Sequence, residues 1–292
     1  MNVEEFKYII KEISPFTDYV YLHVKGEPLM HKHLAEFLKI CEDYKLQVNI
    51  TTNGTRVSAV KDILYSSPAL RQLNISLHSF ENVESYANIA KNTKTESHAN
   101  IEKNTNVIEN TNVVKNTLEE FDLYLKEIVT VAKYLKENTN TITAFRLWNL
   151  DKDNLTKSNR ERNYYVLEQL KSAFDVDFSI EEGLGRNNGI KLTERIYLNQ
   201  DYEFDWPNIE ASYLSDKGHC YGLKTQLAIL VDGSVVPCCL DEDGTINLGN
   251  IFKENLSSIL NSKRAVDIKE GFSRCNVVEE LCKRCGYRER FI

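Results

Sequence analysis

The sequence predicts an α/β protein, with helices over one face of an open barrel of parallel strands and a small cysteine-rich domain after the barrel. Three observations support this class. Helical and strand patterns alternate through roughly the first 180 residues, which implies parallel strands joined by covering helices. Every second residue of most of these strands is polar. Six of the seven cysteines lie in the last quarter of the chain.

The helices are expected from apolar residues that recur at helical spacing. Residues 4–13 show the pattern with Phe6, Ile9, Ile10 and Ile13 on one stripe. The other expected helices cover residues 33–44, 57–67, 118–137 and 161–174.

The strands are expected at residues 18–25, 45–53, 70–79, 141–149 and 176–180. Parallel strands that are buried on both sides are normally apolar on both faces. Here Val48 and Ile50 alternate with Asn49 and Thr51. The period of two puts the polar set on one face, which predicts a wet, ligand-holding lumen. The polar residues concentrate toward the carboxyl ends of the strands, where barrel enzymes place their chemistry.

A six-residue repeat interrupts the alternation at residues 88–117, in units such as "NIAKNT", "NIEKNT" and "NVVKNT". Such a period can form a β-solenoid or a helical extension. Each unit holds only one or two apolar residues, so a polar, partly disordered insertion is favoured. After residue 183 the alternation stops. We therefore expect a barrel over residues 1–183, a linker over 184–219 and a C-terminal domain over 220–292.

Composition limits the class of protein. The chain has 292 residues and a formal net charge of -7, with no basic stripe, which argues against nucleic acid as a partner. No apolar run approaches the roughly 20 residues of a membrane span, and the first residues do not resemble a signal peptide. These features predict a cytoplasmic protein with no membrane partner.

The cysteines favour a metal or redox site over disulfides, because thiols stay reduced in that compartment. An Asp-Gly pair at 232–233 predicts a β-hairpin with a two-residue type I′ turn. That turn pairs Val231 with Ser234. It turns Cys238 toward the more apolar face and Cys239 toward the other.

A four-thiolate site is expected from Cys220, Cys238, Cys282 and Cys285, which have the spacing C-x17-C…C-x2-C. Four thiolates suit either zinc or an iron–sulfur cluster, and the spacing favours neither. The remaining cysteines, Cys41, Cys239 and Cys275, are expected to be unliganded.

Several motifs carry a family resemblance. "YLHVKGEPLMH" resembles the second strand and Gly-Glu-Pro motif of radical S-adenosylmethionine (radical SAM) enzymes, and "ITTNGT", "NISLHSF" and "RLWNL" resemble later strands of their barrel. "CYGLKTQLAILVDGSVVPCCLDEDGTINLGN" and "LCKRCGYRERF" resemble the SPASM-type auxiliary-cluster domain that many of them carry. The resemblance implies a partial (β/α)6 TIM-like barrel and an auxiliary 4Fe–4S cluster on the four cysteines.

The resemblance also implies positions for S-adenosylmethionine. The Gly-Glu-Pro motif, which would receive the methionine amino group, is occupied by Lys25, Gly26, Glu27 and Pro28. Thr51 and Asn53 would face the cofactor from the third strand of the family barrel. Ser76 would hydrogen-bond the ribose or carboxylate, and Arg146 would pair with the methionine carboxylate.

The chain departs from the family at Lys25, where the family more commonly has Gly, and more seriously at the catalytic cluster loop. The family holds its catalytic 4Fe–4S cluster on a C-x3-C-x2-C loop after the first strand, and residues 1–40 contain no cysteine. A start assigned too late, a truncated gene and a cluster-less relative are the alternatives. A missing N-terminal piece with the first strand is favoured, because a whole strand is absent. The chain as written is then expected to be inactive, with S-adenosylmethionine and the second cluster bound only if that piece is present.

Two functions are compatible with these features. The first is radical-based modification of a peptide, protein or small molecule, with an electron donor such as flavodoxin or ferredoxin. The second is a non-catalytic, metal-stabilised binding scaffold.

Overall fold

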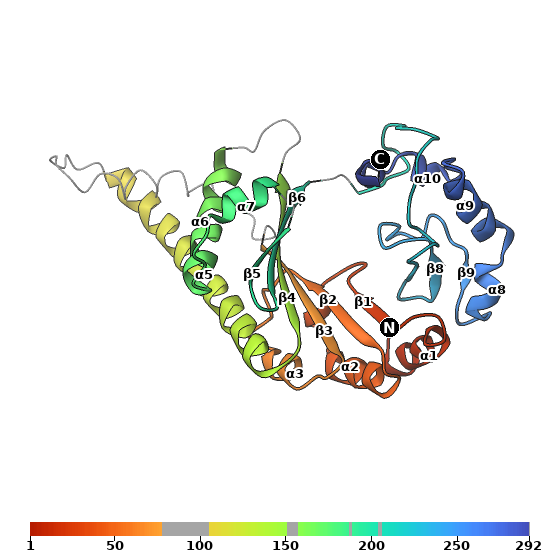
Figure 1. Ribbon diagram of the computed structural model, residues 1–292, viewed down its shortest axis with the longest axis horizontal. Helices are drawn as coiled ribbons and strands as arrows, with labels where there is room; N and C mark the ends of the chain where they lie inside the picture. Colours follow the sequence, from red (N-terminus) through yellow and green to blue (C-terminus); the bar gives the residue numbers. More distant parts are fainter. Residues whose placement is uncertain (78–104, 151–156, 187–188, 204–205, 292) are drawn as a thin grey trace. The chain divides into compact units, whose positions relative to one another are not determined.

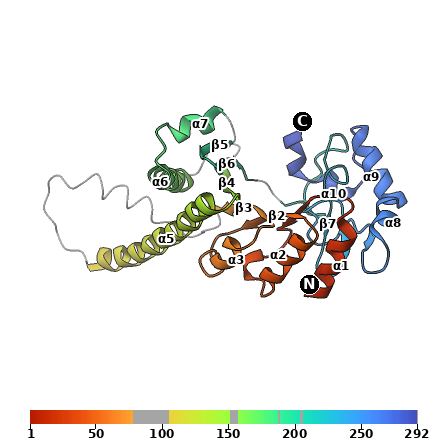
Figure 2. The same cartoon turned by 60° about the horizontal axis from the view of Figure 1, so that its bottom comes forward.

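The computed structural model describes residues 1–77, 105–150, 157–186, 189–203 and 206–291. The chain forms two compact units (Figures 1 and 2). The first unit comprises Met1–Gly26, Lys32–Gln47 and Phe204–Ile292, and the second comprises Glu27–His31 and Val48–Glu203. Each unit is described by itself. The expected division at residues 183 and 219 stays a prediction.

A largely parallel sheet forms the centre of the second unit. Its strands are β2 (Gln47–Thr52), β3 (Leu70–Ser76), β4 (Ile142–Leu150), β6 (Ile196–Tyr202) and β5 (Gly189–Thr193), in the order β2-β3-β4-β6-β5. The pairs β2–β3, β3–β4 and β4–β6 are parallel, and β5 runs antiparallel to β6. The predicted α/β class is confirmed, and the sheet is open, as in a partial barrel.

The helices of this unit are α3 (Lys61–Tyr65), α5 (Thr105–Asn138), α6 (Lys157–Ala173) and α7 (Ile180–Arg186), with a short 3-10 helix η1 at Pro28–Met30. The long helix α5 contacts β4 and α3 (Figure 1). Its buried stripe includes Phe121, Ile128 and Leu135, each fully buried. This helical spacing of apolar residues is the pattern that predicted the helix.

One expected strand of this unit is wrong. Residues 176–180 form no strand, since α7 begins at Ile180, and β6 pairs with β4 instead. The expected linker 184–219 stays a prediction, and its described part contains β5 and β6. Of the repeat at 88–117, residues 88–104 lie outside the described residues, and 105–117 belong to α5. No glycine or proline between 105 and 138 stops that helix.

The first unit contains α1 (Val3–Ile13), β1 (Tyr19–Leu22), α2 (Leu34–Asp43), β7 (Ala228–Ile229), β8 (Ser234–Val236) and β9 (Gly249–Asn250), followed by α8 (Leu256–Leu260), α9 (Lys263–Ser273), α10 (Glu280–Lys283) and the 3-10 helix η3 (Gly286–Phe291). The start of α1 is fixed by a capping box, in which Asn2 and Glu5 exchange side-chain to backbone hydrogen bonds of 2.9 and 2.7 Å.

One hydrophobic core joins α1 to the C-terminal segment. Ile9 of α1 lies in the same buried cluster as Val235, Ile246, Ile259 and Leu281. Phe6 of α1 stacks on Phe37 of α2, with ring centroids 4.0 Å apart. The apolar stripe of α1 therefore supports the domain that carries the cysteines.

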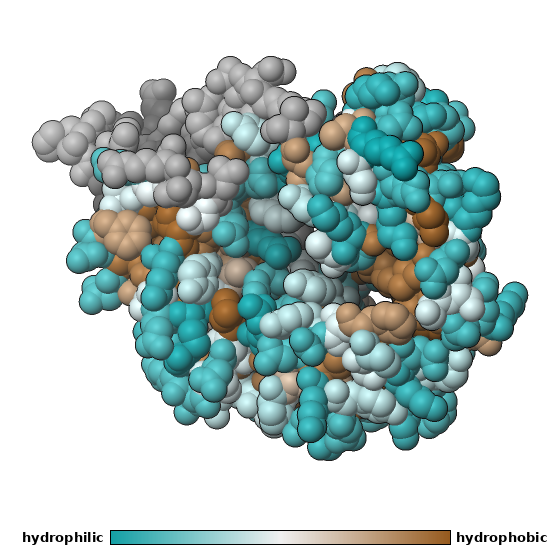
Figure 3. All heavy atoms as spheres, turned by 45° about the vertical axis from the view of Figure 1, so that its right-hand side comes forward, coloured by the Kyte–Doolittle hydropathy of each residue, from teal (hydrophilic) through white to brown (hydrophobic). Residues whose placement is uncertain are grey.

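Hydrophilic side chains cover most of the coloured face drawn in Figure 3, with smaller areas of hydrophobic side chains among them. Within the described residues, no helix combines the length and the hydrophobicity that crossing a bilayer would need.

Candidate functional site

A small pocket in the first unit brings the four predicted thiol ligands together. It is lined by Cys220, Cys238, Cys282 and Cys285. Apolar side chains, among them Leu240, Ile246, Leu281, Tyr287 and Phe291, form much of its wall. Thiols from three separate segments of the chain thus line one pocket. Their roles as ligands stay a prediction.

Local backbone structure presents each thiol. Cys220 precedes a tight loop whose Gly222 amide donates to the Cys220 sulfur at 3.5 Å. Cys238 lies two residues after the end of β8, Cys282 lies in α10, and Cys285 directly precedes η3. The C-x2-C spacing over a single helical turn puts the last two thiols on the same side of the pocket.

The predicted register of the β7–β8 hairpin is wrong by one residue. Ala228 pairs with Val236, and the amide of Leu230 donates to the carbonyl of Ser234, so the loop holds three residues, 231–233. A type I′ turn needs positive φ at both central positions. Gly233 has φ of 84°, but Asp232 is absent from the positive-φ residues described. The strand also ends at Val236, so strand alternation does not direct Cys238 and Cys239.

Burial is the largest influence on the pKa of Cys238, Cys282 and Cys285. It raises the pKa of Cys238 to about 12, against weaker opposing hydrogen bonds from the amides of Leu240 and Asp241. Burial also raises the pKa of Cys282 well above its ordinary value, and the neighbouring thiols add to the effect. Cys238 and Cys282 are therefore protonated at neutral pH in the absence of metal, and metal binding would release their protons.

The chemistry of the donor set fits an iron–sulfur cluster. Four soft sulfur donors, one buried and three half-buried, and a largely apolar wall are what such a group requires. Within the described part of the chain, no three His, Cys, Asp or Glu side chains are arranged to hold a single metal ion.

The other three cysteines do not line the pocket among the residues described, although Cys239 is close enough to Cys220 and Cys285 for those thiols to raise its pKa, after the larger effect of burial. Cys41 is fully buried in α2, where burial raises its pKa to about 12. Cys275 is exposed, in a turn with φ of 56°. Cys239 is half-buried and does not line the pocket among the residues described.

In the second unit, Glu27 ties η1 to the end of β2. Its carboxylate accepts hydrogen bonds from the amide of Leu29 at 3.0 Å, the hydroxyl of Thr52 at 2.6 Å and the amide of Asn53 at 2.8 Å. A carboxylate has about four acceptor positions. Room for one further donor therefore remains. Pro28 occupies the first turn of η1, where its missing N–H costs nothing.

Lys25 and Gly26 belong to the first unit. The Lys25 ammonium lies 2.9 Å from Asp243 and 3.6 Å from Glu242, and the Asp243 hydrogen bond is the largest cause of its raised pKa. Gly26 has φ of 81°, a conformation that favours glycine.

The sheet register aligns the other predicted cofactor residues. Ser76 lies directly opposite Arg146, and Thr51 lies opposite Asn74, two residues before Ser76. These side chains share one face, because residues two apart on a strand point the same way. Asn53 instead uses its side chain locally, accepting from the amide and hydroxyl of Thr55 at 2.9 and 2.7 Å.

Two polar residues of this region were not expected at the site. Asn74, 1% exposed, donates to the carbonyl of Ile50 and the hydroxyl of Thr51. The hydroxyl of Tyr124 in α5 donates to the carbonyl of Asn53 at 2.6 Å. Asn74 belongs to the polar set of its strand, whereas nothing in the sequence links Tyr124 to residue 53.

Comparison with known proteins gives one family match. Residues 220–286 match the profile of SPASM, an iron-sulfur cluster-binding domain. No curated protein matches the chain.

The chain also resembles several solved structures at low identity. BtrN in complex with AdoMet and 2-DOIA is 15% identical, over 98% of this chain and 80% of BtrN, with a TM-score of 0.46. Streptococcus suis SuiB bound to S-adenosylmethionine is 13% identical, over 98% of this chain and 64% of SuiB, with a TM-score of 0.45. The anSMEcpe structure with bound AdoMet is 16% identical, over 98% and 74% of the two chains, with a TM-score of 0.42.

The matched segment contains all four cysteines of the pocket. The profile match and the pocket therefore agree on the same part of the chain. Residues 220–286 of this chain therefore match the SPASM iron–sulfur cluster-binding domain, and the four cysteines of the pocket lie within that match.

Proposed function

We propose that this chain is a radical SAM/SPASM iron–sulfur protein whose C-terminal domain holds one 4Fe–4S cluster through Cys220, Cys238, Cys282 and Cys285. The observation that carries the proposal is the gathering of these four thiols around one pocket in the matched domain. When bound, the cluster would supply one-electron chemistry or a place for substrate to attach.

The residues of the chain would hold and shield this group. Leu240, Ile246 and Leu281 limit the access of water to the pocket, which matters because burial and hydrogen bonds to sulfur set the potential of a cluster. The amides of Tyr287 and Arg288 donate to the Cys285 sulfur and partly offset the effect of burial on its pKa.

Anaerobic reconstitution with iron and sulfide tests the proposal. We expect a brown protein with about four irons per chain. A variant in which Cys282 and Cys285 are both alanine is the matched control and should retain little iron. Stoichiometric zinc with no uptake of iron would contradict the proposal.

We further propose that the polar face of the second unit's sheet receives S-adenosylmethionine. Arg146, with Thr51 and Ser76 on the same face, would meet the methionine carboxylate, while Glu27, within the motif Lys25–Pro28, would accept from the amino group. The register described above supports this arrangement. Arg146→Gln should weaken binding of radiolabelled S-adenosylmethionine at least about tenfold in equilibrium dialysis, because it removes a charge-assisted pair. Arg195→Gln, outside this group, is the control, and equal weakening in both variants would contradict the proposal.

The reaction we propose is radical-based modification of a peptide, protein or small molecule in the cytoplasm, with electrons from a flavodoxin- or ferredoxin-type donor. SuiB, one of the similar structures, has been solved bound to its precursor peptide SuiA. Anaerobic incubation with candidate peptides, followed by mass spectrometry, checks for a modified product.

A non-catalytic scaffold is the second candidate, and one observation favours it. No three of the seven cysteines have the C-x3-C-x2-C spacing of the catalytic cluster loop. We therefore propose that this chain by itself does not cleave S-adenosylmethionine reductively. Formation of 5′-deoxyadenosine with dithionite, above a protein-free control, would exclude the scaffold.

A further inference from the structure

A buried guanidinium lies beside the four cysteines. Arg288 in η3 is 6% exposed and lines the same pocket. Its Nε donates to the carbonyl of Cys282 at 2.7 Å, its Nη1 to that of Lys217 at 3.1 Å and its Nη2 to that of Ser215 at 2.8 Å. Every one of these acceptors is a neutral backbone group. Among the described residues, no carboxylate lies within ion-pair distance of Arg288.

Such an arrangement is costly unless an anion is bound nearby. Arginine keeps its charge under all ordinary conditions, and burying a charge without a counter-charge is strongly unfavourable. The backbone nonetheless leaves room for the guanidinium of Arg288. Gly218 has φ of 137°, and a Cβ at that position would lie 2.5 Å from Nη1 of Arg288. The loop before Cys220 is therefore shaped around the guanidinium.

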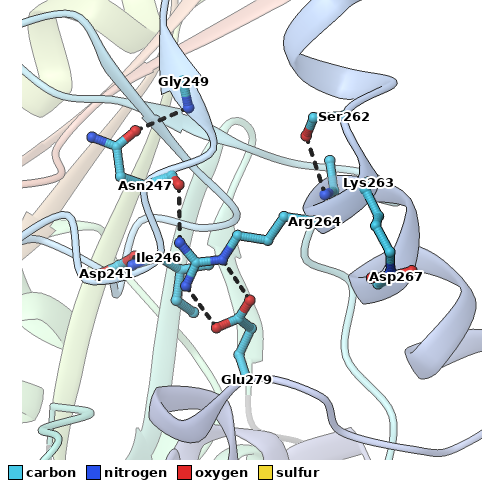
Figure 4. Close-up of polar contacts among 10 residues, drawn as sticks. Asp241, Ile246, Asn247, Gly249, Ser262, Lys263, Arg264, Asp267 and Glu279 are labelled. Carbon is cyan, nitrogen blue, oxygen red and sulfur yellow. Dashed lines mark hydrogen bonds and ion pairs between the residues drawn. The ribbon is translucent and has the colours of Figure 1, made fainter.

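Arg264 provides an internal comparison in the same unit. Its guanidinium forms a two-point ion pair with Glu279, at 2.7 and 2.8 Å, and donates to the carbonyl of Asn247 at 3.0 Å (Figure 4). Its side chain is 44% exposed. A carboxylate and solvent thus stabilise the charge of Arg264. Arg288 is buried from solvent and has no carboxylate within ion-pair distance among the described residues.

We propose that Arg288 is the counter-charge of the group bound by the four thiolates, a positioning residue that sets its reduction potential. The inference rests on the proposed cluster. Four thiolates outweigh the charge of the iron–sulfide core, so the bound group is an anion, and one-electron reduction makes it more negative. A fixed cation in a dry pocket stabilises the reduced form more than the oxidised form. Arg288 therefore raises the potential and strengthens retention of the cluster.

The test compares wild type, Arg288→Gln, Arg288→Lys and Arg264→Gln after anaerobic reconstitution. Iron content is measured first, followed by a dithionite titration monitored by electron paramagnetic resonance. At a fixed solution potential, Arg288→Gln should lower the ratio of reduced to oxidised cluster about tenfold, or about 59 mV for one electron. Arg288→Lys, which keeps the charge, and Arg264→Gln should each stay within about twofold of wild type.

Three results would overturn the inference. Arg288→Gln could titrate like wild type, Arg288→Lys could shift as far as Arg288→Gln, or Arg264→Gln could shift equally. If Arg288→Gln does not fold or take up iron, Arg288→Lys is the deciding variant. A tenfold shift in the reduced-to-oxidised ratio of Arg288→Lys would assign the role of Arg288 to hydrogen bonding and not to charge. Failure of wild type to take up iron would instead refute the proposed cluster, so the two failures are distinguishable.

Discussion

Cys238 and Cys239 are consecutive residues, yet Cys238 lines the four-cysteine pocket and Cys239 does not among the residues described. The separation does not come from strand alternation, because β8 ends at Val236 and both cysteines lie in the bend and turn that follow. The turn toward Asp241, whose amide donates to the carbonyl of Cys238, aims the first thiol inward.

This relationship predicts unequal effects of two neighbouring substitutions. Cys238→Ala leaves three thiols at the pocket and should lose most of the iron after reconstitution. Cys239→Ala should retain iron near the wild-type amount. Iron analysis of both purified variants checks this, and equal loss would mean that both sulfurs reach the cluster.

Gly233 should be essential to the hairpin that precedes Cys238. It has φ of 84°, and a Cβ there would lie 2.3 Å from a ring carbon of Phe252. Gly233→Ala should therefore lower the free energy of unfolding of the iron-free protein by about 1–3 kcal/mol. Gly286→Ala is the control, because a Cβ at Gly286 meets nothing within 4 Å. Similar urea midpoints for the two variants would disprove the argument.

Glu27 should stabilise the second unit independently of any cofactor. Glu27→Gln replaces one acceptor oxygen by a donor facing the amides of Leu29 or Asn53 or the hydroxyl of Thr52, at a cost of about 1–3 kcal/mol. Glu194→Gln, at a side chain 67% exposed, should change the free energy of unfolding by less than about 0.5 kcal/mol. Urea unfolding without S-adenosylmethionine measures both variants. A Glu27 variant as stable as wild type would restrict this residue to ligand binding.

Cys41 should make the iron-free protein sensitive to alkaline pH. Burial raises its pKa from 9.0 to about 12, so the folded state holds this proton more tightly than the unfolded state. The resulting stability is fully present below about pH 9 and is lost as the pH rises toward 12. The loss should approach about 1.4 kcal/mol per pH unit. Cys41→Ala should lose less stability between about pH 8 and about pH 11 than Cys275→Ala, whose thiol is exposed. Parallel losses in the two variants would contradict this.

The strands show which structural features the local sequence pattern predicts and which it does not. The alternation of Ile50 with Thr51, and the polar position of Ser76, predicted a one-sided polar sheet. The register pairs Thr51 with Asn74 and Ser76 with Arg146. The strand expected at residues 176–180 is absent, because a short apolar run is equally compatible with a strand, a turn or the start of a helix. The place of β6 in the sheet depends on its pairing with β4, which is more than 40 residues away in the sequence.

The sequence by itself determined the parallel α/β class, the four-cysteine set and the family resemblance, because periodicity, spacing and motif letters are local properties of the chain. Only the tertiary structure decided that Ile9 of α1 packs in the core of the cysteine domain, that Lys25 pairs with Asp243, and that Arg288 lies buried beside Cys282. These contacts join residues far apart in the chain or depend on burial, and both arise only when the whole unit packs.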